Sequence, residues 1–409
     1  MEKEERKKIV FFLYNRLNDP LIQSNIFLYI NQLIKNHEPF KISIVSFEDP
    51  DFPLTDNQLS HFKQLFDEAN VDWKPVKWHK GDGFFIKLTD VLNSFFIIFK
   101  FRLKGYKHFI SLGSIAGAFI GIVSKLIPLK YYLYQYEPHS EYLLDANIWN
   151  AKSWQFRWLQ RFERLSIRHA SVISSGTEAM QIRLKNEGIR APFFKVTSVA
   201  NDNLFKYSEQ DRDMIRKKLG ISADEKLIIY PGKIGGIYAS VEQIYSIIKE
   251  FLCFNDQYRA LIITPQKTEL AKLVESNLSK KIIILLPIEY TEMPVYLSAS
   301  DIGIVSALPV PSKKFSSNIK VGEYLCSGLP YIVCRGVSED DLVADEFNVG
   351  VVINDFNSVE LREKKEQIFN LLSEDRNVVA QRCRNVGLNY RGFENQYNQF
   401  LKALRQLVN

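Results

Sequence analysis

Short apolar runs rich in β-branched and aromatic residues alternate along this chain with longer amphipathic segments. This alternation predicts βα units that build a parallel sheet. In the first half we expect strands at Ile9–Tyr14, Lys41–Phe47, Val76–His79, His108–Ser111, Tyr131–Tyr136 and Val172–Ser175. The pattern then restarts, with strands expected at Leu227–Tyr230, Ala260–Thr264, Ile282–Leu286, Ile302–Val305, Tyr331–Val333 and Gly350–Ile353.

The 409 residues are therefore expected to form two doubly wound α/β domains in tandem. A segment of linker composition, Val196–Phe205, predicts the boundary, so we assign 1–200 to the first domain and 201–389 to the second. A last helix, about Glu394–Leu407 within 390–409, is expected to return to the first domain. Between the strands we expect helices at Leu21–Lys35, Asp56–Ala69, Ser153–His169, Ser240–Phe254, Lys267–Ser276, Tyr290–Ala299 and Ile319–Ser327.

The composition excludes several other classes of protein. Hydrophobic residues make up 46% and charged residues 24%, which indicates a globular chain. The four cysteines are scattered, which argues against a disulfide framework or a zinc site. No signal-peptide core follows the charged start, and Lys125 with three glycines interrupts the longest apolar stretch, Ile110–Ile127. We therefore expect a cytoplasmic protein.

The positive charge is unevenly placed. Between Lys80 and Ala170 there are 13 Lys or Arg and 6 Asp or Glu, which suggests an anionic surface or substrate near this domain, or else a solvated helix face. The aromatic and basic stretch Phe84–Phe109 could bind a membrane surface, but we expect its aromatic rings to be core. Trp154 and Trp158 have helical spacing and are likewise expected to pack.

The most informative segment is FSSNIKVGEYLCSGLP, Phe315–Pro330, which follows an expected strand. Ser316, Ser317 and Asn318 are good N-cap residues for a helix that begins near Ile319. The free amides of its first turn and the helix dipole favour a phosphate there.

Two charged residues follow on this helix. Lys320 adds a positive charge in the first turn, and Glu323 lies three residues later on nearly the same face. A carboxylate there can accept hydrogen bonds from the two hydroxyls of a ribose. The alternative is an ordinary capped helix with an exposed Lys–Glu pair.

A second segment, YPGKIGGIYAS, runs from an expected strand into a helix. Its glycines, beginning with Gly232, let the backbone approach phosphate oxygens, and Lys233 can neutralise one. The spacing is neither that of a Walker loop nor that of the Rossmann fingerprint, so a plain strand-to-helix turn remains the alternative.

Two first-half loops also follow expected strands. In YQYEPHSEY, His139 with Glu137 beside it can hydrogen-bond a sugar hydroxyl or a phosphate, or it is a structural loop histidine. In NRLNDPLIQSN, Arg16 and Asp19 are placed to reach a ligand, although the loop has no glycine. No residue grouping has metal-ligand spacing, so no metal and no separate cofactor are expected.

Taken together, these segments resemble glycosyltransferase family 4, the large retaining GT-B family. The resemblance covers nearly the whole chain and is strongest from Tyr230 to Val352. It implies the GT-B fold, with two Rossmann-like domains facing across a cleft. It also implies that the first domain binds the acceptor and the second binds a nucleotide-sugar donor such as a UDP- or GDP-sugar. Transfer would proceed with retention of configuration.

The resemblance also assigns roles. Lys233 takes the place of the basic residue that meets the diphosphate, Glu323 that of the ribose-binding glutamate, and His139 that of a histidine that contacts the transferred sugar. Tyr290 matches the region that holds the base. The loop and helix start at Ser317, Asn318 and Ile319 match those near the sugar and phosphates. No nucleic-acid partner is implied.

The sequence departs from the family at two positions. Phe315 stands where a first glutamate is usual, and Tyr238 where a second lysine is usual, although Lys320 can supply that charge. A saccharide or lipid-linked acceptor, made into cell-surface polysaccharide at the inner face of the membrane, is the setting that family analogy suggests. Two alternatives remain, a GT-B-like nucleotide-sugar epimerase and a non-catalytic nucleotide-sugar-binding protein.

Overall fold

The computed structural model describes residues 6–79, 84–135, 137–236 and 238–409. Two compact units are present. Unit 1 consists of Met1–Glu141, Ala151–Val196 and Tyr397–Asn409, and unit 2 consists of Tyr142–Asn150 and Thr197–Gln396. The short segment Tyr142–Asn150 groups with unit 2, which the sequence did not lead us to expect.

Unit 1 contains a parallel seven-stranded sheet in the order β3-β2-β1-β4-β5-β6-β7. Its strands are β1 (Lys7–Leu13), β2 (Phe40–Glu48), β3 (Asp72–Lys77), β4 (His108–Leu112), β5 (Lys130–Tyr134), β6 (Val172–Ser175) and β7 (Phe193–Lys195). Its helices are α1 (Pro20–Gln23), α2 (Ile26–Lys35), α3 (Asp56–Glu68), α4 (Phe84–Leu103), α5 (Gly113–Val123), α7 (Trp154–His169) and α8 (Glu178–Asn186). Helix α6 (His139–Asp145) begins in unit 1, and its residues from Tyr142 onward group with unit 2.

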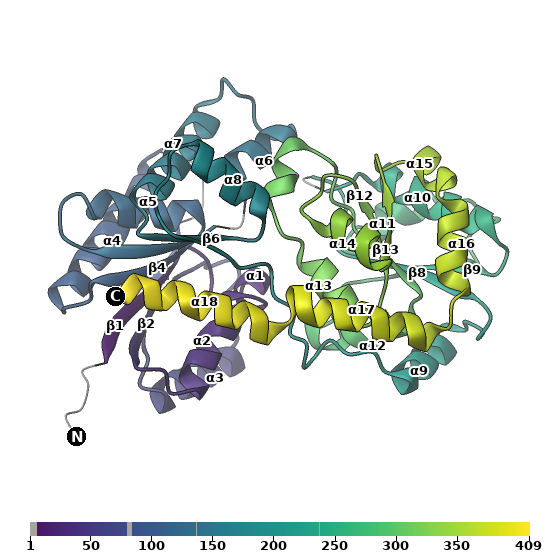
Figure 1. Ribbon diagram of the computed structural model, residues 1–409, viewed down its shortest axis with the longest axis horizontal. Helices are drawn as coiled ribbons and strands as arrows, with labels where there is room; N and C mark the ends of the chain where they lie inside the picture. The colour runs from purple at the N-terminus through teal and green to yellow at the C-terminus, as the bar shows by residue number, and fades with distance from the viewer. Residues whose placement is uncertain (1–5, 80–83, 136, 237) are drawn as a thin grey trace. The chain divides into compact units, whose positions relative to one another are not determined.

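Aromatic side chains from β1 show how helices cover both faces of this sheet. Phe11 stacks on Phe400 of α18 (Phe393–Val408), with ring centroids 6.4 Å apart. Tyr14, just beyond β1, meets Phe119 of α5 at 5.4 Å. Successive strand residues point to opposite faces, so α18 covers one face and α5 the other. Within unit 1, α2 and α3 lie on the side of α18, whereas α4 and α7 lie on the side of α5 (Figure 1).

Unit 2 contains a parallel six-stranded sheet in the order β10-β9-β8-β11-β12-β13. Its strands are β8 (Lys226–Pro231), β9 (Tyr258–Ile263), β10 (Ile282–Leu285), β11 (Ile302–Ile304), β12 (Tyr331–Cys334) and β13 (Gly350–Ile353). Its helices are α9 (Glu209–Leu219), α10 (Val241–Phe254), α11 (Lys267–Ala271), the 3₁₀ turns η1 (Tyr290–Glu292) and η2 (Pro311–Phe315), α12 (Met293–Ala299), α13 (Ile319–Cys326), α14 (Asp340–Phe347), α15 (Ser358–Glu363), α16 (Lys365–Ser373) and α17 (Arg376–Arg391).

The prediction of two doubly wound α/β domains is confirmed, although several element bounds were wrong. Strand β3 begins at Asp72 rather than Val76, and it contains Pro75, because an edge strand needs no donor on its open side. The helix expected at Leu21–Lys35 is broken into α1 and α2, and α11 already ends at Ala271. The expected β5 strand reached Tyr136, which lies outside the described residues.

Two packing predictions for unit 1 are confirmed only in part. Trp154 and Trp158 are 51% and 49% exposed on α7, and Trp158 packs against Phe162 of the same helix. In Phe84–Phe109, Phe101, Tyr106 and Phe109 are buried, but Phe96 and Phe99 are exposed. None of the helices in the described ranges has an apolar run of the length and purity that a bilayer crossing needs.

Candidate functional site

The candidate site lies at the centre of unit 2, where the order of its sheet changes direction. Strands β8 and β11 are hydrogen-bonded neighbours although β9 and β10 separate them in sequence. In open α/β sheets, ligands bind beyond the carboxyl ends of the strands at such a point. The glycine turn that begins at Gly232 follows β8, and the segment that leads into α13 follows β11. Both sequence motifs of unit 2 therefore lie at the switch point.

Lys320 and Gly232 bring these two motifs into contact. Gly232 has φ +150°, and a Cβ added there would collide with Nζ of Lys320. The same Nζ lies 5.0 Å from the centroid of the Tyr230 ring and 5.8 Å from that of Tyr238. Tyr238 stands where the resemblance led us to expect a second lysine. It therefore lies beside Lys320, which can supply that positive charge. Lys233 is exposed on the turn, and its carbonyl accepts a 2.5 Å hydrogen bond from the Tyr230 hydroxyl.

The start of α13 lacks a side-chain cap from its own N-cap residue. Asn318 occupies that position, but its Nδ2 donates to Asp340 Oδ2 at 2.9 Å instead of its side chain capping the helix. The Ser316 hydroxyl donates to the Lys313 carbonyl, and the Ser317 hydroxyl accepts from the Ser198 amide. The helix begins at Ile319 with Asn318 in the N-cap position, as predicted, but the Asn318 side chain makes no capping hydrogen bond. The amides of the first turn, from Ile319 onward, are therefore available to another acceptor.

Two further residues complete the site: Glu323 on the next turn of α13, and Tyr290 on η1. The Tyr290 hydroxyl lies near enough to Glu323 to affect the pKa of its carboxyl, and the Tyr290 ring packs against Phe205 with centroids 5.3 Å apart. Burial raises the pKa of Glu323 to about 7, opposed by the Tyr290 hydroxyl and the charge of Lys320. Burial lowers the pKa of Lys320 to about 8, opposed by the charge of Glu323. The site thus holds a partly buried cation and a partly buried carboxyl group on the same helix, each affected by the other's charge.

A buried ion pair that the sequence did not indicate holds the loop before α13. Arg391 and Asp340 are both fully buried and form an ion pair. Arg391 also donates to Ser317 Oγ, which accepts from the Ser198 amide at 3.0 Å as well. Because Asp340 binds Asn318 too, this pair fixes both residues that precede the helix. Phe315, in place of the family glutamate, is buried and adds no charge to the site.

In unit 1 the first βα loop is organised by its own charges. Arg16 Nη2 lies 4.0 Å from Asp19 Oδ2, and its guanidinium stacks over the Phe52 ring at 4.6 Å. The other oxygen of Asp19 accepts from the Leu21 amide at 2.9 Å. Asp19 therefore caps α1, and both side chains are half-buried.

His139 begins α6, and its Nδ1 lies 3.3 Å from Glu137 Oε1. The imidazole is 49% exposed, so the pair is open to solvent. Beside it in sequence, Ser140 donates its amide to buried Glu163 at 3.0 Å, and burial raises the pKa of that carboxyl.

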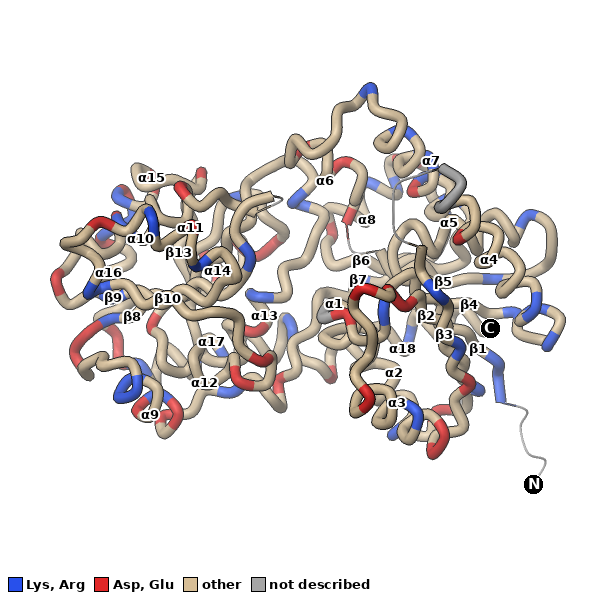
Figure 2. Tube along the Cα trace, turned by 180° about the vertical axis from the view of Figure 1, so that it is seen from behind, with Lys and Arg blue, Asp and Glu red and all other residues tan. Residues whose placement is uncertain are grey.

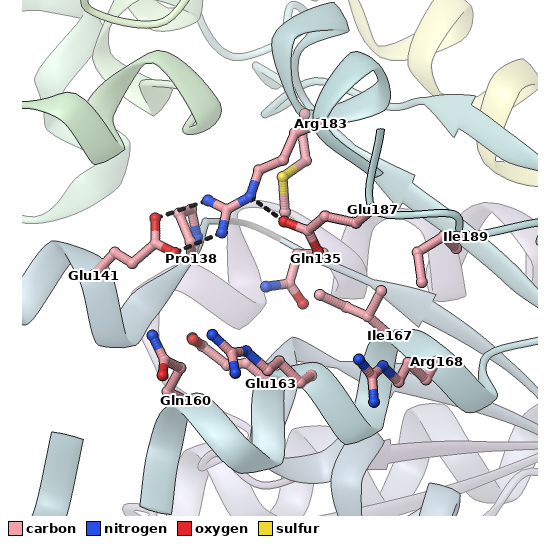
Figure 3. Close-up of a pocket in the computed structure, with 12 residues that line it drawn as sticks. Gln135, Pro138, Glu141, Gln160, Glu163, Ile167, Arg168, Arg183, Glu187 and Ile189 are labelled. Atoms are coloured by element: carbon pink, nitrogen blue, oxygen red, sulfur yellow. Dashed lines mark hydrogen bonds and ion pairs between the residues drawn. The ribbon is translucent and has the colours of Figure 1, made fainter. Parts of the chain in front are cut away.

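A pocket of about 340 Å³ lies in unit 1 between α6, α7 and α8 (Figure 3). Arg183 spans it, donating to both oxygens of Glu141 at 2.5 and 2.7 Å and to Glu187 at 2.8 Å. Glu163 and Arg164 also line it. Such a lining of alternating charge can hydrogen-bond the hydroxyls of a saccharide.

A second polar cluster of unit 1 was missed by the sequence reasoning. The fully buried Asp90 on α4 accepts from the Tyr14 hydroxyl at 2.8 Å and lies 2.6 Å from His79 Nδ1. Tyr14 follows β1 and His79 follows β3, so the cluster lies at the carboxyl edge of the sheet. Within the described residues, no group of three or more His, Cys, Asp or Glu side chains could hold a metal ion.

Comparison with solved structures identifies the fold. HepE from Anabaena, solved in complex with UDP, matches 98% of this chain and 100% of its own, with a TM-score of 0.68 and 15% identity. A glycosyltransferase from Rickettsia africae matches 98% of this chain and 99% of its own, with a TM-score of 0.71 and 11% identity.

The chain has the GT-B fold.

A putative UDP-N-acetylglucosamine 2-epimerase from Listeria monocytogenes shares it, over 98% of this chain and 96% of its own, with a TM-score of 0.65 and 14% identity. No protein-family model matches the sequence, and no curated protein matches it.

Proposed function

We propose that this protein is a glycosyltransferase that moves a sugar from a nucleotide-diphosphate sugar to an acceptor. The observation that carries the proposal is the contact between Lys320 and the turn at Gly232, one helical turn from Glu323. A diphosphate between the turn and the uncapped start of α13 would meet Lys320 and backbone amides. The ribose would then reach Glu323, and the base would lie toward Tyr290.

In the proposed mechanism, unit 2 stabilises the leaving nucleoside diphosphate. Lys320, Lys233 and the amides at Ile319 face the negative charge that develops as the glycosidic bond to the phosphate breaks. These groups supply positive charge without a divalent ion. We expect retention of configuration, as in glycosyltransferase family 4, with a donor phosphate oxygen taking the proton of the acceptor hydroxyl.

The acceptor side of the proposal rests on unit 1. His139 with Glu137, the loop of Arg16 and Asp19, and the pocket around Arg183 offer hydrogen-bonding groups for a saccharide or lipid-linked acceptor. A UDP- or GDP-sugar as donor, and a role in cell-surface polysaccharide synthesis in the cytoplasm at the inner face of the membrane, complete the proposal. The complex of HepE with UDP supports a uridine nucleotide as the first donor class to test.

The first experiment is a thermal-shift screen of UDP-, GDP- and ADP-sugars against the full chain, because a ligand of the native state raises the melting temperature. The donor found is then incubated with the protein, and release of nucleoside diphosphate is measured. We expect Lys320→Ala, Glu323→Ala and Lys233→Ala each to reduce the shift and the release. Lys218→Ala, an exposed lysine on α9, is the matched control and should leave both unchanged.

The outcomes separate the three functions. Diphosphate release that the site variants abolish supports the transferase. A shift without any turnover, even with a panel of saccharide acceptors, would leave a nucleotide-sugar-binding protein. Conversion of the donor sugar to its epimer would instead assign the epimerase reaction, which the similarity to the Listeria structure makes worth testing. If no nucleotide sugar shifts the melting temperature, the site assignment itself is wrong.

A further inference from the structure

Helix α4 exposes a continuous apolar stripe to solvent. Five large side chains, spaced three or four residues apart, are 37% to 74% exposed: Leu88, Leu92, Phe96, Phe99 and Leu103. This spacing places them on one face of the helix. The opposite face is anchored, because Asp90, Ser94, Ile98 and Phe101 are buried against unit 1. The stripe therefore belongs to a packed helix, and it lies on the side of the sheet that α5 also covers (Figure 1).

The loop between α5 and β5 extends the stripe. Leu126 in this loop is 78% exposed, and the Arg102 side chain on α4 donates its Nε to the carbonyl of Pro128 at 2.8 Å. That bond joins the last turn of α4 to the loop, which brings Leu103 and Leu126 to the same end of the helix. Clusters of exposed apolar side chains of this kind mark interaction surfaces in soluble domains.

The chain around these side chains is predominantly basic, although Asp67 and Asp72 lie near Lys104. From Val91 to Tyr136 the sequence holds no Asp or Glu. The exposed lysines in this stretch (blue in Figure 2) are Lys100, Lys104, Lys107, Lys125 and Lys130. These lysines contribute to lowered pKa values of two neighbouring groups. Burial and then the charges of Lys100 and Lys104 lower the pKa of Lys74, and burial and then Lys130 lower the pKa of His108.

We propose that this α4 surface, the six apolar side chains from Leu88 to Leu126 with the five lysines, docks unit 1 on an anionic phospholipid membrane. Leucine and phenylalanine side chains enter the boundary between headgroups and acyl chains, while lysines meet the lipid phosphates. A second copy of the chain fits the surface poorly, since pairing the surface with itself would bring the five lysines of each copy together. The proposal does not depend on the transferase assignment.

The test is sedimentation of the full chain with vesicles of DOPC alone and of DOPC with DOPG. We expect binding to the DOPG vesicles that weakens with salt, and much weaker binding to DOPC alone. Leu92→Glu/Phe96→Glu should reduce the affinity at least tenfold, on the order expected when apolar contact is replaced by charge. Lys100→Gln/Lys125→Gln should reduce it about 25-fold, from about fivefold per lysine.

Matched controls use exposed residues of unit 2. Met214→Glu/Val378→Glu and Lys217→Gln/Lys218→Gln change the same residue types away from α4 and should bind vesicles like the wild type. Circular dichroism melting checks that every variant is folded, and Lys320→Ala should keep full vesicle binding. The proposal is overturned if DOPG vesicles do not bind, if the α4 variants bind as well as the controls, or if light scattering shows a dimer that Phe96→Glu dissociates.

Discussion

At the scale of single residues, Lys320 and Glu323 both have pKa values close to neutral pH. The pKa of Glu323 is raised to about 7 and that of Lys320 lowered to about 8, in both cases mainly by burial. The diphosphate of a nucleotide sugar is a diester and does not titrate in this range. We therefore expect donor affinity to rise as pH increases through about 7 and to fall above about 8, measured by calorimetric titration.

Two variants test which side chain causes the rise and which the fall of donor affinity with pH. Glu323→Gln should remove the rise near pH 7, because the amide does not ionise, and Lys320→Arg should remove the fall above pH 8. An affinity that stays constant between pH 6 and 9 would contradict the proposed roles of both side chains.

The burial of these two charged groups should also lower the stability of the folded protein. Lys320 has a folded pKa below its unfolded value, so it binds fewer protons when folded and its penalty is largest below about pH 8. Glu323 has a folded pKa raised from 4.5 to about 7, so its penalty grows as pH rises between these values and stays constant at higher pH. At pH 7.5, Lys320→Met/Glu323→Gln should increase the free energy of unfolding by about 1–4 kcal/mol in urea titrations, while abolishing donor binding.

Lys218→Met/Glu366→Gln changes an exposed lysine and an exposed glutamate in the same way and should leave the stability within about 0.5 kcal/mol of wild type. A double site variant that is less stable than this control would show that the pair serves the fold rather than the ligand.

The residues of the candidate site differ in how far sequence could reveal them. Lys320, Glu323 and the turn at Gly232 belong to short local patterns that follow strands, so helix and turn physics predicted them. Arg391 and Asp340 could not be paired in this way, because they are 51 residues apart and joined only by the tertiary fold. The same holds for Tyr14 and Asp90, 76 residues apart.

At the scale of elements, the glycine turn and α13 act as one unit. Gly232 combines φ +150° with close contact to the Lys320 ammonium group. We expect Gly232→Ala to lower donor affinity at least tenfold, since about 1–3 kcal/mol of backbone strain and a displaced lysine act on the same place. The measurement is calorimetric titration at pH 7.5.

Gly220→Ala is the control for this prediction. Gly220 ends α9 with φ +68° and has no neighbour within 4 Å of an added Cβ, so alanine there strains the backbone away from the site. It should cost about 1 kcal/mol of stability and leave affinity unchanged. If the two variants bound the donor with equal affinity, the turn at Gly232 would have no part in ligand binding.

Strands were predicted well where apolar runs are continuous, as in β1, β8 and β12, because such runs are typical of strands buried on both faces. The failures have a shared cause. The sequence pattern shows which side chains are apolar but not which face of a helix packs against the rest of the unit. The side chains of Phe96, Trp154 and Trp158 were therefore expected to be more buried than they are.

At the scale of the whole molecule, each unit has its own sheet and buried interior. All donor-binding residues proposed here, from Gly232 to Glu323, belong to unit 2. We expect calorimetry to resolve two unfolding transitions, of which a bound nucleotide sugar raises only one. Hydrogen exchange should show the added protection in unit 2 segments. A single transition, raised as a whole, would mean that the two units unfold together.

The edge strand β3 has a further consequence for the behaviour of the chain at high concentration. Pro75 lies within it, opposite Ser46 of β2, and Lys74 and Lys77 flank it. Proline and lysine prevent an edge from adding a strand of a neighbouring molecule. Pro75→Val/Lys77→Val should therefore turn a soluble preparation into one that aggregates through intermolecular β-pairing, visible as thioflavin fluorescence, whereas Pro53→Val in the nearby loop should not.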